Sequence, residues 1–153
     1  MNRGARHGTP QAGARENGGD RVIGIVIVAH GGLAREYRHA MEHVVGELDG
    51  VVTIATGPDD DRAEKQAEIC KAANTVDSGD GVVIVTDMFG GSPCNLSLKA
   101  CQPDNRRILF GANLPMLIKL AKSRRKPVEQ AAKQAMDAGR KYIDCHAVEP
   151  ASA

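Results

Sequence analysis

The sequence predicts an open α/β fold, with a mainly parallel four-stranded sheet and helices on both of its faces. Short runs of β-branched residues alternate with segments whose apolar residues have helical spacing, and the links between them are short. The first β-branched run is apolar throughout, which is typical of a strand buried on both faces. At 153 residues, 42% hydrophobic but only 3% aromatic, the chain suits one domain with an aliphatic core.

Four strands are expected where the β-branched residues gather. The first reads VIGIVIVA, and turn residues such as Asp49-Gly50 and Asp77–Asp80 precede the next two. The expected strands are residues 22–29, 51–55, 81–86 and 107–111. Arg140–Val148 roughly alternates apolar and polar residues, so it predicts a short antiparallel edge strand after the last helix.

Helices are expected in the intervals between these strands. Apolar residues at helical spacing from Leu33 to Leu48 predict a helix that Gly50 closes, and a small-residue face from Ala63 to Val76 predicts the next. Gly139 is expected to stop the last helix. The remaining predicted helices are residues 93–101, 115–121 and 128–138.

The first 20 residues differ from the rest of the chain. They contain one proline, five glycines and no Val, Ile, Leu or Phe, so they cannot bury enough apolar surface to offset the entropy of ordering. We expect a disordered polar tail over residues 1–20 and one folded domain over residues 22–148.

Composition also excludes some classes of function. The 20 basic and 19 acidic residues give a net charge of +1, which argues against a nucleic-acid-binding protein. No apolar run approaches the roughly 18 residues of a membrane-spanning helix, so membrane insertion is not expected. The four cysteines are scattered without a C-x-x-C pair, and we interpret them as small buried apolar residues of a reduced, cytoplasmic protein.

Polar residues and glycines follow the first and third predicted strands. Ligands of such sheets bind beyond the carboxyl ends of the strands, and in a flavodoxin-like order these two strands are neighbours. His30 and Asp87 should therefore lie side by side, joined by a hydrogen bond of about 2.7–3.2 Å. Glycines follow each of them, at Gly31-Gly32 and at Gly90-Gly91, the latter pair leading into Ser92.

This arrangement suits the transfer of a phosphoryl group. One nitrogen of a neutral imidazole is a nucleophile, and a carboxylate that holds the other N–H fixes the tautomer and stabilises the cation that forms. The N–H groups of Gly31 and Gly32, and those of Gly90, Gly91 and Ser92, open predicted helices, where anions are favoured.

Structural explanations compete with this interpretation. A histidine after a strand can be a plain hydrogen-bonded residue, and Ser92 can be a helix N-cap. His39 and His43 have the i, i+4 spacing of metal ligands but lack an evident third ligand. The acidic run Asp59–Asp61 is better explained as the first turn of a helix. The sequence contains no P-loop, dinucleotide-binding motif or nucleophile elbow.

Four sequence blocks resemble the EIIA domain of the mannose class of the bacterial sugar phosphotransferase system (PTS). They are IVIVAHG at 25–31, TGPD at 56–59, VTDMFGGSP at 85–93 and GANLPML at 111–117. Their order and spacing also match, and the resemblance covers residues 22–146.

The resemblance implies a complete function. His30 would accept a phosphoryl group on Nε2 from the phosphocarrier HPr and pass it to a histidine of an EIIB partner, with Asp87 orienting the ring through Nδ1. Gly31, Gly32, Gly90, Gly91 and Ser92 would surround the phosphoryl group, and no metal or cofactor would be needed. The family fold has a fifth, antiparallel strand that is exchanged within a homodimer, and Arg140–Val148 could supply it here.

The chain departs from the family pattern in places. Phe89 replaces the usual tryptophan of the loop, and a glutamate after the second strand is missing. We also expect no fused sugar-binding or membrane domain. These features leave an alternative open, a stand-alone regulatory module whose phosphorylation at His30 controls binding to a non-transport target. A second alternative, the phosphocarrier subunit related to dihydroxyacetone kinase, fits the G-G-S-P block poorly.

Overall fold

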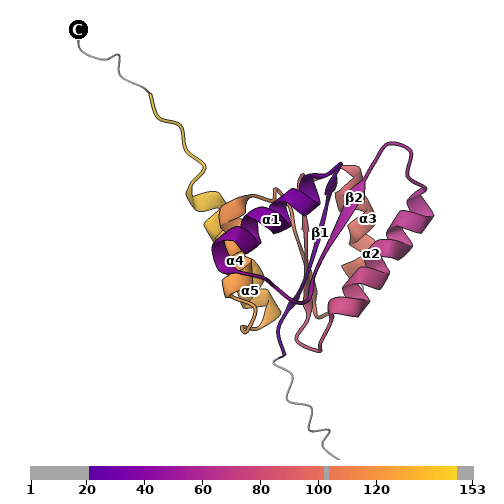
Figure 1. Ribbon diagram of the computed structural model, residues 1–153, viewed down its shortest axis with the longest axis horizontal. Coiled ribbons are helices and arrows are strands. Elements are labelled where there is room, and N and C mark those ends of the chain that lie inside the picture. The colour runs from indigo at the N-terminus through magenta and orange to yellow at the C-terminus, as the bar shows by residue number, and fades with distance from the viewer. Residues whose placement is uncertain (1–20, 102–103, 148–153) are drawn as a thin grey trace, which may run out of the picture.

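The computed structural model describes residues 21–101 and 104–147, and over them the chain forms a parallel sheet between two layers of helices (Figure 1). The strands lie in the order β2-β1-β3-β4 and each neighbouring pair is parallel, which confirms the predicted sheet and its flavodoxin-like order. The predicted tail at residues 1–20 and Val148 lie outside the described residues. The strands are β1 (Gly24–His30), β2 (Val51–Thr56), β3 (Val82–Thr86) and β4 (Arg106–Leu109).

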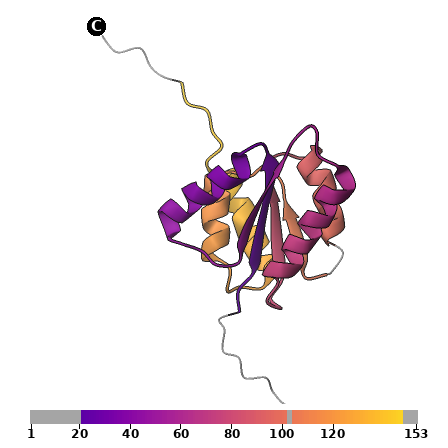
Figure 2. The same cartoon turned by 45° about the vertical axis from the view of Figure 1, so that its right-hand side comes forward.

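The helices divide between the two faces of the sheet, as Figure 2 shows from a second direction. One face carries α1 (Leu33–Val45), α4 (Leu114–Lys122) and α5 (Val128–Lys141). The other carries α2 (Arg62–Val76), α3 (Ser92–Ser97) and the 3₁₀ turn η1 (Leu98–Cys101).

Strand β1 belongs to both layers of the core. Ile25 and Ile27 face the layer of α1, α4 and α5, whereas Val26 and Val28 face α2 and α3. All four side chains are fully buried. The continuous apolar run of the sequence thus marks a central strand, because each face of the sheet needs apolar residues from it.

Two helix ends differ from the predicted ones. Helix α1 ends at Val45, not near Gly50, because Gly46 adopts a φ of 88° and its N–H bonds to the carbonyl of Glu42. Helix α5 continues through Gly139 to Lys141, so the predicted stop at this glycine is wrong. A Cβ at Gly139 would lie 3.0 Å from the side chain of Met116, so the glycine permits a close approach of α4 and α5.

Past Lys141 the chain leaves the domain. Residues 143–147 are exposed and pair with no described strand, and Figure 1 shows them running away from the sheet. The predicted fifth strand at Arg140–Val148 is not seen: its first two residues are helical, and pairing of the remainder stays a prediction. No helix within the described ranges is both long and apolar enough to cross a membrane.

The cysteines are less uniform than the sequence predicts. Cys94 is buried, Cys70 is half-buried and Cys145 is exposed in the segment after α5, and each of the three carries a free thiol. The expectation of buried apolar behaviour is thus confirmed at Cys94 and wrong at Cys145, because the latter lies beyond the last element that packs on the sheet.

Candidate functional site

His30 and Asp87 meet at the carboxyl end of the sheet. His30 is the last residue of β1, Asp87 directly follows β3, and the two strands are neighbours. Nδ1 of the imidazole lies 2.8 Å from Oδ2 of the carboxylate, and the backbone N–H of His30 donates to the same oxygen at 3.0 Å. The predicted juxtaposition and hydrogen bond are therefore confirmed.

The environment of Asp87 keeps its carboxyl ionised. Burial by itself raises the pKa of this group, but hydrogen bonds from the backbone and ring of His30, the charge of His30 and the N–H of Met88 outweigh it and hold the pKa below its ordinary value. An ionised carboxylate only accepts hydrogen bonds, so Nδ1 of the imidazole carries the proton. In the neutral ring, Nε2 then keeps its lone pair.

The two side chains differ in exposure. The His30 side chain is 49% exposed, whereas that of Asp87 is 11% exposed. A protein that approaches this end of the sheet therefore meets the imidazole first, while the carboxylate behind it is protected. This order suits a ring that must make and break a covalent bond.

Gly91 leaves room for the imidazole. A Cβ at this position would lie 3.1 Å from Cε1 of His30 and 3.2 Å from Cγ of Met88. Any larger residue would displace the ring or the methionine. The sequence pattern predicts that this glycine binds phosphate, which stays a prediction, and the structure shows a steric reason for a glycine here.

Gly31 and Gly32 play different parts. The N–H of Gly31 donates to the carbonyl of Thr56 at 2.9 Å, so it extends the pairing of β1 with β2 and is not free for a phosphate as the sequence suggested. Gly31 instead turns the chain with a φ of 55°. Gly32 is the N-cap of α1, and its N–H has no acceptor among residues 21–101 and 104–147.

Gly90 and Ser92 lie at the start of α3, on either side of Gly91 in the chain. Gly90 adopts a φ of 78°, which favours glycine, and Gly91 is the N-cap of α3. The explanation of Ser92 as an N-cap is therefore wrong. Its hydroxyl makes no hydrogen bond within the described part of the chain, so the group is available at the edge of the site.

The other candidates from the sequence have structural partners. Asp61 is the N-cap of α2 and accepts from the N–H of Glu64, and Asp60 accepts from the N–H of Gly57. These acids thus precede the helix, which begins at Arg62, and do not form its first turn as predicted. His39 lies 3.7 Å from Glu36 on the exposed surface of α1. No group of three potential metal ligands occurs among the described residues.

Exposed apolar side chains occur in the segments that follow His30 and Asp87. Leu33 is 39% exposed, Met88 53% and Phe89 76%. Phe89 touches Phe110 edge to face, with ring centres 5.1 Å apart. Exposed apolar groups in the segments that carry the candidate site are suited to contact with another protein.

Sequence reasoning missed Tyr37. Its hydroxyl donates to the carbonyl of Ala112 at 2.8 Å, close enough to the site for the charge of Asp87 to act on it. The one available signal was a phenol on the otherwise aliphatic face of α1, and only the fold shows which carbonyl it meets.

A family model described as "PTS system fructose IIA component" matches residues 24–137. The chain belongs to the EIIA-man family. This confirms the resemblance that the four sequence blocks carry. Since EIIA proteins are components of the phosphotransferase system, the family supports a general role in phosphotransfer.

Curated relatives agree with the family. The chain is 27% identical over 104 residues to the mannose-specific EIIAB component of Escherichia coli K12, covering 67% of this chain and 32% of the relative. It is also 27% identical over 100 residues to the sorbose-specific EIIA component of Lacticaseibacillus casei, covering 63% and 70% of the two chains. The chain thus spans about a third of the length of the EIIAB relative.

Solved structures of EIIA proteins share the fold. The mannose/sorbose-specific IIA subunit of Enterococcus faecalis superposes with a TM-score of 0.73 at 23% identity, covering 85% of this chain and 98% of that one. A PTS IIA protein associated with a fucose utilisation operon of Streptococcus pneumoniae gives 0.69 at 27% identity, covering 79% and 91%. The α/β architecture is that of the EIIA-man family.

Proposed function

We propose that this protein is a phosphoryl carrier that accepts phosphate from phospho-HPr onto His30 and passes it to a histidine of an EIIB partner. The observation that carries the proposal is the contact of Nδ1 with Asp87, which leaves Nε2 unprotonated in a half-exposed ring. Membership of the EIIA-man family supplies the donor and acceptor classes.

The transfer is balanced without a further reactant. The lone pair of Nε2 attacks phosphorus, and the phosphorus–nitrogen bond of the donor breaks and returns its electron pair to the donor's ring. The Nδ1 proton stays in its hydrogen bond, so the Asp87 carboxylate offsets the positive charge of the ring. The N–H of Gly32 and the hydroxyl of Ser92 are unpaired groups that can meet the phosphoryl oxygens. A second transfer repeats these steps with the EIIB histidine as nucleophile.

Radiolabelled phosphoenolpyruvate, enzyme I and HPr test the proposal. The full chain should acquire a label that is stable in base and labile in acid, as a phosphohistidine is, and His30→Ala should acquire none. His39→Ala is the matched control, because this histidine is exposed on α1, away from the carboxylate, and its variant should be labelled like the parent. A label on His30→Ala of the same size as on the parent would contradict the proposal.

The acceptor decides between the transport and regulatory versions of this function. Addition of an EIIB protein to the labelled chain should move the label to EIIB. If the label stays on His30 and a non-transport protein binds only one of the two phosphorylation states, the regulatory alternative is supported instead.

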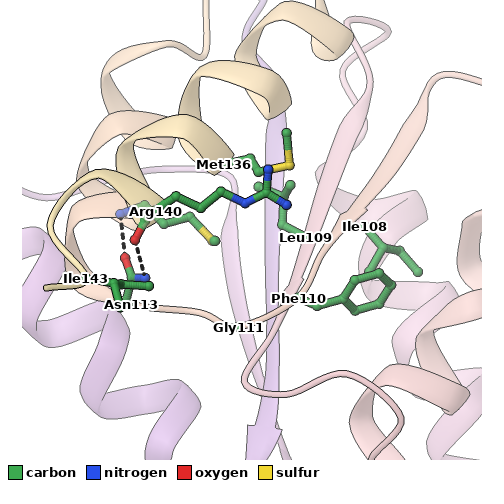
Figure 3. Close-up of a pocket in the computed structure, with 10 residues that line it drawn as sticks. Ile108, Leu109, Phe110, Gly111, Asn113, Met136, Arg140 and Ile143 are labelled. Atoms are coloured by element: carbon green, nitrogen blue, oxygen red, sulfur yellow. Dashed lines mark hydrogen bonds between the residues drawn. The ribbon is translucent and has the colours of Figure 1, made fainter.

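We also propose that the homodimer of the family forms here by exchange of the part of the predicted strand at Arg140–Val148 that follows α5. In the described residues β4 is an outer strand, and a groove of about 380 Å³ runs beside it between β4 and the ends of α4 and α5 (Figure 3). Ile108 and Phe110 line this groove, and the exposed Ile143 lies at its end. The same segment of a second copy could pair with the free edge of β4.

Light scattering tests the exchange. The full chain should have the mass of a dimer, and a chain that ends at Lys141, which keeps all of α5, should have the mass of a monomer. A monomeric full chain would contradict the proposal, and so would a truncated chain that stays dimeric.

A further inference from the structure

Tyr37 connects the segment that follows His30 to the segment that supports Asp87. It lies on α1, the helix that begins three residues after His30, and it packs against the core on that face of the sheet. Its hydroxyl donates to the carbonyl of Ala112 at 2.8 Å. Ala112 is 8% exposed, so this hydrogen bond fixes a nearly buried loop.

Ala112 in turn holds the end of β3. The ladder between β3 and β4 ends at Val85 and Leu109, and beyond it the N–H of Ala112 donates to the carbonyl of Thr86 at 3.0 Å. Thr86 is fully buried, and its side-chain hydroxyl has no partner among the described residues. Its position therefore depends on its packing, on its pairing with Val28 of β1 and on the hydrogen bond from Ala112. Asp87 is the next residue.

These contacts close a ring around the site. From His30 the chain leads through α1 to Tyr37, which is hydrogen-bonded to Ala112. Ala112 is hydrogen-bonded to Thr86, and the next residue, Asp87, contacts the His30 side chain. A displaced Ala112 would loosen the position from which the carboxylate reaches the imidazole. Small displacements matter here, because an acceptor must stay within hydrogen-bond distance of Nδ1.

We infer that Tyr37 is a positioning residue for the proposed phosphoryl transfer: its hydroxyl holds Ala112 and thereby Asp87 in the place that orients His30. The inference rests on the proposed function. Burial, and then the charge of Asp87, raise the pKa of the Tyr37 hydroxyl, so it remains a protonated donor at neutral pH. The chain contains only one other tyrosine, the exposed Tyr142, which provides a matched control.

A double-mutant cycle tests the inference in the full chain. Tyr37→Phe keeps the ring in the core and removes only the hydroxyl, so the rate of labelling of His30 by phospho-HPr should fall about fivefold, as for the loss of one hydrogen bond. Tyr142→Phe should leave the rate unchanged. In an Asp87→Asn background, Tyr37→Phe should cause no further loss, because the residue acts through the carboxylate.

The cycle distinguishes positioning from general stability. An unchanged rate in Tyr37→Phe overturns the inference, and so does a loss of equal size in both backgrounds. Thermal unfolding identifies the temperature at which every variant is folded, and the rates are compared there. If the parent chain is not labelled at His30 at all, the proposed function fails. Nitrogen NMR of the His30 imidazole then tests by itself whether Tyr37 positions Asp87.

Nitrogen NMR of the imidazole reads the same contact without any transfer. In the unphosphorylated parent the His30 signals should be those of the tautomer with its proton on Nδ1. Tyr37→Phe should reduce the share of this tautomer, and Tyr142→Phe should not. An identical His30 spectrum in all three proteins overturns the inference.

Discussion

Two carboxylates at opposite ends of the sheet pair with cationic or potentially cationic side chains, and only one of the pairs suits chemistry. Asp87 meets His30 at the carboxyl ends of the strands, while Asp77 meets Arg106 at the amino ends, where α2 ends and β4 begins. In both cases burial on its own raises the pKa of the carboxyl, but hydrogen bonds and the partner's charge outweigh burial and hold the pKa below its ordinary value. The pKa shift alone therefore does not separate them.

The pairs differ in what they leave unused. The Arg106 side chain is 5% exposed, and its terminal nitrogens bond to the carbonyl of Ala100 and to the side chains of Asn74 and Asp77. Its charge is therefore enclosed by the protein. In His30, Nδ1 is hydrogen-bonded to Asp87, whereas Nε2 has no hydrogen bond within the described residues, and the side chain is 49% exposed. The pair at the carboxyl end thus leaves one nitrogen available in a half-exposed ring, whereas the pair at the amino end buries its charged groups.

The largest expected effect breaks the pair at the carboxyl end. In Asp87→Asn the amide can donate to Nδ1 and shift the proton of the imidazole to Nε2, so labelling of His30 should slow on the order of 10³-fold. Asp77→Asn is the matched control and should be labelled at the parent's rate, since it lies at the other end of the sheet. Similar slowing in both variants would remove the distinction between the two ends.

The reciprocal change breaks the pair at the amino end. Arg106→Met removes the buried partner of Asp77 and the hydrogen bond to the Ala100 carbonyl, so the free energy of unfolding should fall by about 3 kcal/mol. Urea denaturation measures this loss. The labelling rate per folded molecule should equal that of the parent, and a loss of labelling without a loss of stability would contradict the assignment of this pair to structure.

Acid should weaken the fold through both carboxyls. A carboxyl whose pKa is lower in the folded than in the unfolded chain stabilises the fold above its unfolded pKa, near 4, and this stability is lost as the pH falls through the folded pKa. Denaturation between about pH 3 and pH 7 should therefore show a flatter pH dependence in Asp77→Asn and in Asp87→Asn than in the parent. If the free energy of unfolding depended on pH equally in all three proteins, the lowered pKa values of the two carboxyls would be refuted.

The smallest expected effect is spectroscopic. Burial, followed by the charge of Asp87, raises the pKa of Tyr37, so Asp87→Asn should lower that pKa towards its ordinary value without reaching it. An absorbance titration of tyrosine resolves this change, with Tyr37→Phe identifying the remaining signal as that of Tyr142. An unaltered titration of Tyr37 would show that the carboxylate does not act on it.

The sequence was informative where local pattern and topology agree. Continuous β-branched runs predicted β1 and β3, and the rule that parallel strands end at one edge placed His30 beside Asp87. The sequence did not show which of several structural roles a given glycine has. Gly46 and Gly50 both adopt positive φ, and only the fold shows that the first ends α1, while Gly139 permits helix packing and ends nothing.

Hydrogen bonds between distant segments were also beyond the sequence. The N–H of Gly31 belongs to the ladder with β2, and the hydroxyl of Tyr37 finds a carbonyl 75 residues away. Each depends on the packing of separate elements, which no local spacing records.

The most direct measurement locates the phosphoryl group on the ring. With histidine labelled by ¹⁵N, phosphorylation of the full chain should produce coupling between phosphorus and Nε2 of His30, while Nδ1 keeps its proton and its contact with Asp87. Coupling to Nδ1 instead would mean that the carboxylate does not hold that nitrogen, and it would contradict this account at its centre.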